Sequence, residues 1–133
     1  MKEQIFSGKR KTAIARANIK KGNGKITINK RPIELFPELN QLELKEPILI
    51  AHEILGKSDF DINVNVIGGG LSSRIEASRL AIARAILGFS KDEKLKSAYI
   101  KYDRNMLVAD TRRKEAYKPG DSKARAKRQT SYR

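Results

Sequence analysis

Apolar and polar residues alternate along two stretches in the first half of the chain. At residues 12–20 and at residues 60–66, every second position is apolar, which is typical of a strand with one buried face. Residues 21–24 (KGNG) have the composition of a turn, and residues 25–29 then continue as a strand. This spacing predicts a hairpin between the strands at 12–20 and 25–29, preceded by a short strand at 4–7.

Helical spacing of apolar residues begins in the middle of the chain. Pro47 suits the first turn of a helix over residues 47–55, and Gly56 is well placed to end it, whereas the stretch before Pro47 is ambiguous. The longest helix is expected at residues 73–87. Ser73 and Glu76 have the spacing of a capping box at its start, and Gly88 can close its end.

This longest predicted helix carries small residues on one side. Ala77, Ala81 and Ala85 recur every four residues, so the helix can lie close against a sheet. A shorter helix follows Ser90, and its apolar face consists of Leu95, Ala98, Tyr99 and Tyr102. Residues 106–108 (MLV) form a last apolar anchor. The pattern therefore predicts strands, a helix, a strand and two helices.

The chain after residue 108 contains no Leu, Ile, Val, Met or Phe to bury. Residues 112–133 hold nine Lys and Arg against Glu115 and Asp121, a net charge of +7 out of +14 for the whole chain. Such a segment cannot fold alone, because it has no core and its like charges repel each other. We therefore expect a domain at residues 1–108 and an extended basic tail at residues 109–133, long enough to follow a polyanion. The alternative is a disordered, solubilising tail.

Composition argues against several classes of protein. The chain has 133 residues, no Cys and a single His, His52, and we find no spacing of metal ligands and no nucleophile–base pair. We therefore expect no enzyme activity, no cofactor, no metal and no small-molecule substrate. The lack of Cys fits the cytoplasm. No apolar stretch has the length of a signal peptide or a membrane span, and the tail lacks the apolar groups of a membrane anchor, so no membrane partner is expected.

Two further segments could contact phosphates. Residues 8–11 (GKRK) are predicted to form a turn with three adjacent cations, although they do not match a phosphate-binding loop. Residues 68–70 are three glycines before a helix, and a helix N-terminus favours anions. Arg74 and Arg79 lie on the first turns of that helix. The alternatives are a solvated basic turn and a flexible connection between strand and helix.

These positive charges favour nucleic acid as the partner. Two kinds of protein would have such a partner. The chain is either a component of a folded ribonucleoprotein or a general compactor of DNA or RNA. The first would prefer one folded RNA, and the second would show no preference. Both predict binding that weakens with salt.

Several segments resemble one known family, ribosomal protein nine of the small subunit, in the order in which they occur. The segments are residues 7–17 (SGKRKTAIARA), 22–29 (GNGKITIN), 67–70 (IGGG) followed by 81–85 (AIARA), 101–113 (KYDRNMLVADTRR) and 125–133 (RAKRQTSYR). The last two segments are similar to the archaeal and eukaryotic branch of the family. The resemblance spans nearly the whole chain.

The resemblance implies a fold, a particle and partners. The expected fold is a two-layer α/β (α+β) domain of sheet and helices, like the second domain of ribosomal protein five, followed by the tail. The expected role is structural: to bind ribosomal RNA (rRNA) of the 3′ major domain, in the head of the small subunit, beside neighbouring head proteins. The tip of the tail would meet the anticodon loop of transfer RNA (tRNA) in the peptidyl site.

These arguments together predict a set of binding residues. The residues expected to contact rRNA are Lys9, Arg10, Lys11, Arg16, Gly68, Gly69, Gly70, Arg74, Arg79, Arg112, Arg113, Lys114, Lys118, Lys123 and Arg125. The residues expected to contact tRNA are Lys127, Arg128, Tyr132 and Arg133. Arginine can bind two phosphate oxygens at once or stack on a base, and tyrosine rings can stack on unpaired bases.

Overall fold

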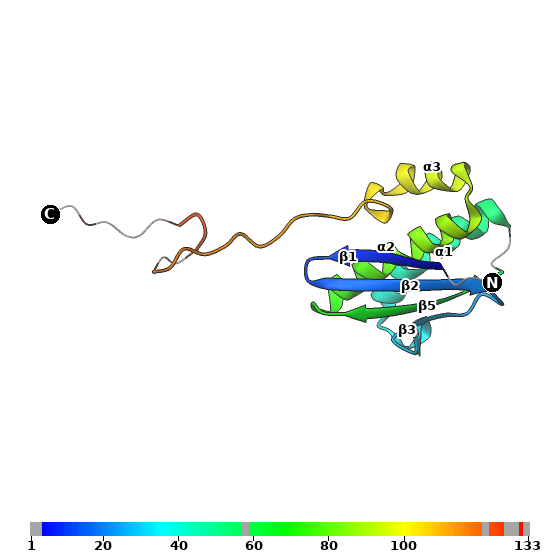
Figure 1. Ribbon diagram of the computed structural model, residues 1–133, viewed down its shortest axis with the longest axis horizontal. Coiled ribbons are helices and arrows are strands. Elements are labelled where there is room, and N and C mark those ends of the chain that lie inside the picture. The colour runs from blue at the N-terminus through cyan, green and yellow to red at the C-terminus, as the bar shows by residue number, and fades with distance from the viewer. Residues whose placement is uncertain (1–3, 57–58, 121–122, 127–130, 132–133) are drawn as a thin grey trace.

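The computed structural model describes residues 4–56, 59–120, 123–126 and 131. Its sheet has five strands in the order β1-β2-β5-β3-β4 (Figure 1). The strands are β1 (Gln4–Arg10), β2 (Ala13–Lys21), β3 (Ile26–Ile28), β4 (Arg31–Pro32) and β5 (Phe60–Ile67). The helices are α1 (Glu38–Leu55), α2 (Leu71–Ser90) and α3 (Glu93–Tyr102), with 3₁₀ turns η1 (Ile33–Leu35) and η2 (Arg104–Met106). The expected mixed α/β fold is confirmed.

The predicted hairpin between residues 12–20 and 25–29 is wrong, because β5 lies between these strands. β2 pairs antiparallel with β1 and β5, and β3 runs parallel to β5. The carboxylate of Asp61 in β5 accepts hydrogen bonds from the backbone N–H groups of Asn23 and Lys25, each at 2.9 Å. These bonds, the Lys25 bond first, lower the pKa of Asp61. The glycine-containing turn therefore wraps around an acid of β5 and does not reverse into a hairpin.

The first strand is longer than predicted. Gly8, Lys9 and Arg10 belong to β1, and only Lys11 and Thr12 form the turn into β2. The expected four-residue basic turn is therefore wrong. Gly8 is buried against α2, where an added Cβ would lie 2.7 Å from the backbone nitrogen of Ala81. The small residues of α2 thus allow the close approach of helix and strand that their spacing predicts.

Each helix begins at a different residue from the one predicted. Helix α1 starts nine residues early, so Pro47 lies inside it; the hydroxyl of buried Tyr99 donates to the Pro47 carbonyl at 2.7 Å. Helix α2 starts at Leu71 with no side-chain cap, so the predicted capping box is wrong. Asp92, not Ser90, caps α3 by accepting a bond from the backbone N–H of Lys94 at 2.8 Å.

The predicted helix end is confirmed for α1 and is wrong for α2. Gly56 ends α1 in a left-handed conformation, as predicted. Gly88 lies inside α2 instead of ending it, and packs against the ring of Phe6 so closely that a Cβ would overlap that ring. Lys91, at φ 53°, is the residue that ends α2. A glycine is thus no sure sign of a helix end where it also serves close packing.

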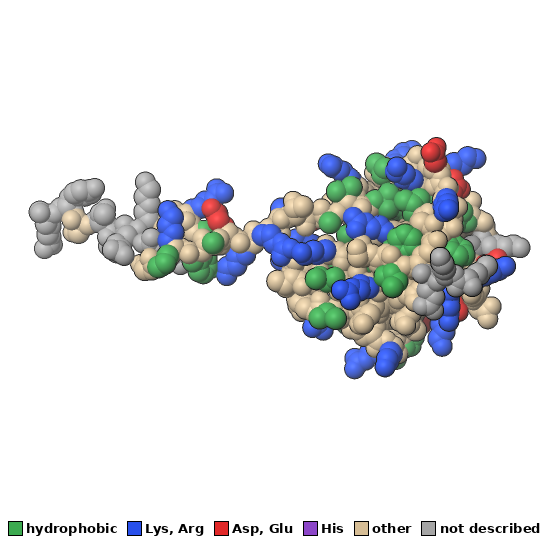
Figure 2. Space-filling model, in the orientation of Figure 1, with side chains coloured by type: hydrophobic (Ala, Val, Ile, Leu, Met, Phe, Trp, Pro, Cys, Tyr) green, Lys and Arg blue, Asp and Glu red, His purple; other side chains and the backbone are tan. Residues whose placement is uncertain are grey.

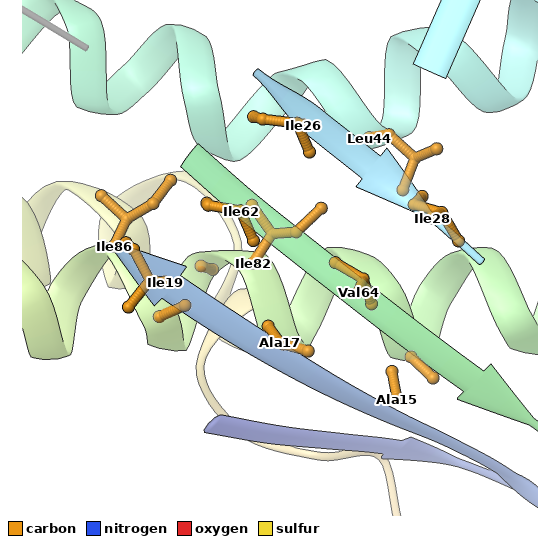
Figure 3. Close-up of a cluster of buried hydrophobic side chains, with 14 of the residues drawn as sticks. Ala15, Ala17, Ile19, Ile26, Ile28, Leu44, Ile62, Val64, Ile82 and Ile86 are labelled. Atoms are coloured by element: carbon orange, nitrogen blue, oxygen red, sulfur yellow. The ribbon is translucent and has the colours of Figure 1, made fainter. Parts of the chain in front are cut away.

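The core lies between one face of the sheet and the helices (Figure 3). The alternating apolar residues of β2 and β5 point inward and are buried, as predicted, against Ile82 and Ile86 of α2. Met106 is buried too, so the expected anchor begins there, but Val108 and Tyr102 are exposed. The other face of the sheet is open and presents polar residues from β2 and β5 together with exposed Ile5, Ile14 and Ile67.

Candidate nucleic-acid interface

Basic segments from the two ends of the chain meet where the tail leaves the domain. The β1–β2 turn and the first tail residues line an open cleft, which we call the basic cleft. It consists of Arg10, Lys11, Thr12, Arg112, Arg113 and Lys114. Lys11 adopts a left-handed conformation, with φ 51°, at the tip of the turn. Cations that are far apart in the sequence therefore share one concave surface.

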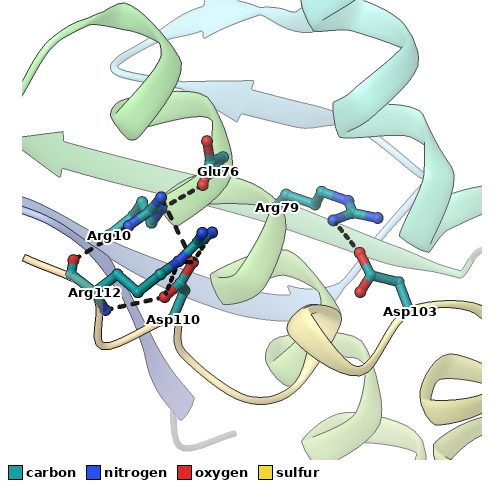
Figure 4. Close-up of polar contacts among 6 residues, drawn as sticks. All are labelled: Arg10, Glu76, Arg79, Asp103, Asp110 and Arg112. Atoms are coloured by element: carbon teal, nitrogen blue, oxygen red, sulfur yellow. Dashed lines mark hydrogen bonds and ion pairs between the residues drawn. The ribbon is translucent and has the colours of Figure 1, made fainter.

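An ion-pair network fixes one wall of the basic cleft (Figure 4). Arg10 Nε donates to Glu76 Oε2 of α2 at 2.6 Å, and Arg10 Nη2 lies 3.5 Å from Asp110 Oδ2. Arg112 Nη2 lies 2.7 Å from the same carboxylate. The hydrogen bond from the Arg112 side chain is the main cause that lowers the pKa of Asp110 to about 2. Asp110 stays ionised at neutral pH and holds the tail near β1.

A second arginine ties the same segment to the domain. Arg84 of α2 donates through Nε to the carbonyl of Leu107 at 3.0 Å and through Nη1 to the carbonyl of Ser7 at 2.7 Å. We call residues 107–112 the tail root. Because a planar guanidinium can serve two acceptors at once, Arg84 joins the tail root to the edge strand β1. The direction of the tail at its start is thus set by protein contacts.

Beyond the tail root, the tail runs away from the domain in extended form (Figure 1). Residues 111–120 are exposed throughout, and none of them lies in a helix or strand. Within the described part of the tail, Lys114 Nζ lies 4.6 Å from the centre of the Tyr117 ring, and Arg125 pairs with Glu115 at 3.0 Å. Lys118 and Lys123 are exposed. These side chains present charge to solvent and not to a protein core.

The three glycines before α2 have different surroundings. A Cβ on Gly68 would lie 2.6 Å from the Thr12 carbonyl oxygen, and one on Gly69 would lie 2.9 Å from the Ala13 Cβ. Both residues also have positive φ. Their close approach is therefore to the β1–β2 turn of the same chain, which explains them without RNA. Only Gly70 faces open space.

Arg74 and Arg79 also have different surroundings. Arg74 is exposed beside Gly70, and its Nε donates to the Gly68 carbonyl at 3.0 Å. It lines a small, partly apolar pocket together with Arg31, a cation that the sequence argument did not select. Arg79 instead pairs with Glu46 of α1 and with Asp103, whose Oδ2 lies 2.9 Å from Arg79 Nη1. The guanidinium of Arg79 thus faces carboxylates within the protein.

The remaining predicted residues lie on the open face of the sheet or outside the described residues. Lys9 and Arg16 are exposed on β1 and β2, on the side away from the helices. Figure 2 shows blue Lys and Arg side chains spread across this face with little red among them. Lys127, Arg128, Tyr132 and Arg133, the residues expected at the tip of the tail, lie outside the described residues.

Sequence reasoning missed the residues that organise the tail root. Arg84, Glu76 and Asp110 make these contacts, but none was selected as a functional residue. One signal was available for Arg84, the only charged residue in a buried alanine-rich helical turn, residues 81–85. A lone cation in such a place usually has a protein partner. The partners of Glu76 and Asp110 depend on tertiary contacts.

Comparison with known proteins gives one consistent result. The family model described as ribosomal protein S9/S16 matches residues 8–133. The chain belongs to this family. A protein of Methanococcus maripaludis strain C5, named small ribosomal subunit protein uS9, is 49% identical over 129 residues, 95% of each chain. A protein of the same name from Methanococcus vannielii is 48% identical, also over 95% of each chain.

Membership in a ribosomal protein family confirms the resemblance seen in the sequence and the expectation of a non-enzymatic, RNA-binding protein. In the part of the chain that the structure describes, no three His, Cys, Asp or Glu residues form a group able to hold a metal ion. No helix among the described residues has the length and apolar character to cross a membrane.

Proposed function

We propose that this protein is a structural component of the small ribosomal subunit in the cytoplasm, where it binds rRNA of the head and supports translation. The observation that carries the proposal is the basic cleft, which continues into an exposed cationic tail. The high identity to proteins named for the small ribosomal subunit supports the same assignment. Phosphate contacts by Lys and Arg supply affinity and position the protein on folded RNA.

We assign the phosphate contacts to cations that the protein leaves exposed. In the basic cleft these are Lys11, Arg113 and Lys114, and the open face of the sheet adds Lys9 and Arg16. Further exposed cations lie along the tail, at Lys118, Lys123 and Arg125, and at the start of α2, at Arg74. Arg79 is left out because its guanidinium faces Glu46 and Asp103. Arg10 and Arg112 shape the cleft through Asp110 and contribute charge to it.

Removing cleft cations tests this assignment. In the triple variant Lys11→Gln/Arg113→Gln/Lys114→Gln, we expect the salt dependence of binding to head rRNA to fall by roughly 2–3 in log–log slope, since each phosphate that is no longer neutralised removes about 0.7–0.9. The matched control removes three exposed lysines of α3, Lys94→Gln/Lys96→Gln/Lys101→Gln. Equal slopes for the two variants, measured by filter binding across a salt series, would contradict the assignment.

Sedimentation tests the role in the particle. In cell extract we expect the protein to migrate with small subunits and to shift to light fractions after ribonuclease treatment. Migration as a free protein in both gradients would refute the ribosomal function. Equal affinity for random duplex DNA and for head rRNA would instead favour a general compactor of nucleic acid.

We propose further that the tip of the tail contacts tRNA in the peptidyl site. Residues 112–133 carry nine cations, and residues 111–120 are exposed and lie in no helix or strand, which supports a long reach from the rRNA contact. Deleting residues 131–133 should leave assembly intact and speed the dissociation of peptidyl-site tRNA. Unchanged dissociation kinetics in ribosomes that carry the truncated protein would refute this contact.

A further inference from the structure

One segment of this basic protein has the opposite charge. Residues 33–56, which comprise η1 and α1 with their flanks, contain five Glu and one Lys, a net charge of −4. The rest of the chain therefore carries +18, since the whole chain carries +14. Of these five acids, Glu34, Glu38, Glu43 and Glu53 are exposed, whereas Glu46 pairs with Arg79. A phosphate backbone is repelled by such a surface.

The same segment exposes large apolar side chains. Leu35, Leu39, Leu42 and Leu49 are 72%, 77%, 57% and 60% exposed. The last three are spaced by three and seven residues, so they lie on one side of α1. The buried residues of this helix, Leu44, Pro47 and Ala51, lie on its other side. We call the four exposed leucines the leucine face.

Helix α1, which carries three of the four residues of the leucine face, is anchored to the rest of the domain. Arg79 joins Glu46 of α1 to Asp103, and Tyr99 of α3 donates to the Pro47 carbonyl. Helix α1 lies on the side of the sheet that the helices cover (Figure 1). Lys9 and Arg16 are exposed on the open side. An apolar surface of this kind, rimmed by charge, is typical of a site of protein association.

We propose that the leucine face binds a basic amphipathic segment of another protein in the same ribosomal particle. This inference rests on the proposed function, because it takes the particle as its setting. Apolar residues of the partner would cover the leucines, and its Lys or Arg would pair with the surrounding glutamates. The tail of this chain is a poor occupant, because after Val108 it has no Leu, Ile, Val, Met or Phe to place against the leucines.

Photo-crosslinking within purified small subunits tests the partner. A photoreactive residue, p-benzoylphenylalanine, replaces Leu42 in one variant and Ile5, another exposed apolar residue, on β1, in the control. We expect the probe at position 42 to attach to a segment of another ribosomal protein that contains both apolar residues and Lys or Arg, and the probe at position 5 to miss that segment. Attachment to rRNA, to a second copy of this chain or to no protein overturns the inference.

A binding measurement tests the chemistry of the interface. A synthetic peptide of the crosslinked segment should bind the full chain, and the Leu42→Glu/Leu49→Glu variant should weaken its Kd at least tenfold. The Ile5→Glu control should leave this Kd unchanged. An unchanged Kd in the double variant overturns the inference. Because these leucines are exposed, affinity for head rRNA should persist and report that the variant is folded.

The two proposals fail in different ways. If the chain does not enter ribonuclease-sensitive particles, the proposed ribosomal function fails before any crosslink is formed. If the chain enters these particles but position 42 contacts only RNA or solvent, the ribosomal function stands and the leucine face is not a protein-binding surface.

Discussion

The arginines of this chain fall into two groups that the sequence alone does not distinguish: some bind oxygens of the protein itself, and others are exposed. Arg10, Arg79 and Arg84 bind carboxylates or carbonyls of the protein itself, whereas Arg113 and Arg16 are exposed. The guanidinium suits both tasks, because its planar array of donors matches carbonyl, carboxylate and phosphate oxygens equally well. At the scale of a residue, function is therefore decided by which oxygens surround the side chain.

Arg84 should contribute to the stability of the folded chain. In Arg84→Gln, the carbonyls of Ser7 and Leu107 lose a charged donor, so we expect the free energy of unfolding to fall by about 1–3 kcal/mol. Urea denaturation measures this change. Arg16→Gln, on the open face of the sheet, is the control and should change it by less than about 0.5 kcal/mol. Equal effects of the two substitutions would contradict the role of Arg84.

The carboxyl of Asp110 should titrate far below its ordinary range. Its pKa is lowered from 3.8 to about 2, mainly by the hydrogen bond from the Arg112 side chain. A lowered pKa means that the stabilising effect of this bond is fully present above pH 3.8 and disappears as the pH falls through about 2. NMR titration of the side-chain carboxyl carbon should show this midpoint, and Arg112→Gln should raise it. An ordinary midpoint in the wild-type chain would show that the tail root is not held in this way.

At the scale of elements, close packing of β1 on α2 explains several small residues. Gly8 lies against the backbone of α2 at Ala77 and Ala81, and Gly88 of α2 lies against Phe6 of β1. A side chain larger than hydrogen at Gly8 would push the strand from the helix, and one at Gly88 would displace the Phe6 ring. The same packing places Arg84 and Glu76 of α2 within reach of β1, so the approach of two elements also builds the tail root.

Adding one methyl group between β1 and α2 should be costly. In Gly8→Ala the new Cβ would lie 2.7 Å from the Ala81 nitrogen and closer still to the Ala77 oxygen, so we expect a loss of about 1–3 kcal/mol in the free energy of unfolding. Gly70→Ala is the matched control, because that Cβ meets no atom within 4 Å and the residue has φ −82°. Calorimetry should show a lowered Tm for the first variant only.

At the scale of the whole molecule, charge is segregated. Basic residues gather at the cleft, on the open face of the sheet and along the tail, while α1 and its flanks carry five of the fifteen acidic residues. This separation lets one small protein present a surface for polyanions and another surface suited to basic protein. The tail is exposed beyond the tail root, so it adds charge without adding to the core.

Removing the tail beyond Arg113 should therefore weaken rRNA binding without lowering the free energy of unfolding. A chain that ends there keeps the interactions of Asp110 and Arg84 but lacks seven cations. We expect its free energy of unfolding to stay within about 0.5 kcal/mol of the full chain. The salt dependence of rRNA binding should fall by about 0.7–0.9 in slope for each phosphate that the tail would have neutralised. A large decrease in stability would show that the tail packs on the domain.

Local patterns determined much of this protein. Alternation in β2 and β5 and the small residues of α2 follow from backbone periodicity, so the buried faces were predictable. Tertiary structure decided the rest. Only the tertiary structure places β5 between β2 and β3, with Asp61 bonded to the turn before β3, and brings Arg79 to the carboxylates of Glu46 and Asp103. Periodicity reports which face of an element is apolar, but only the folded chain brings together the oxygens that a cation will bind.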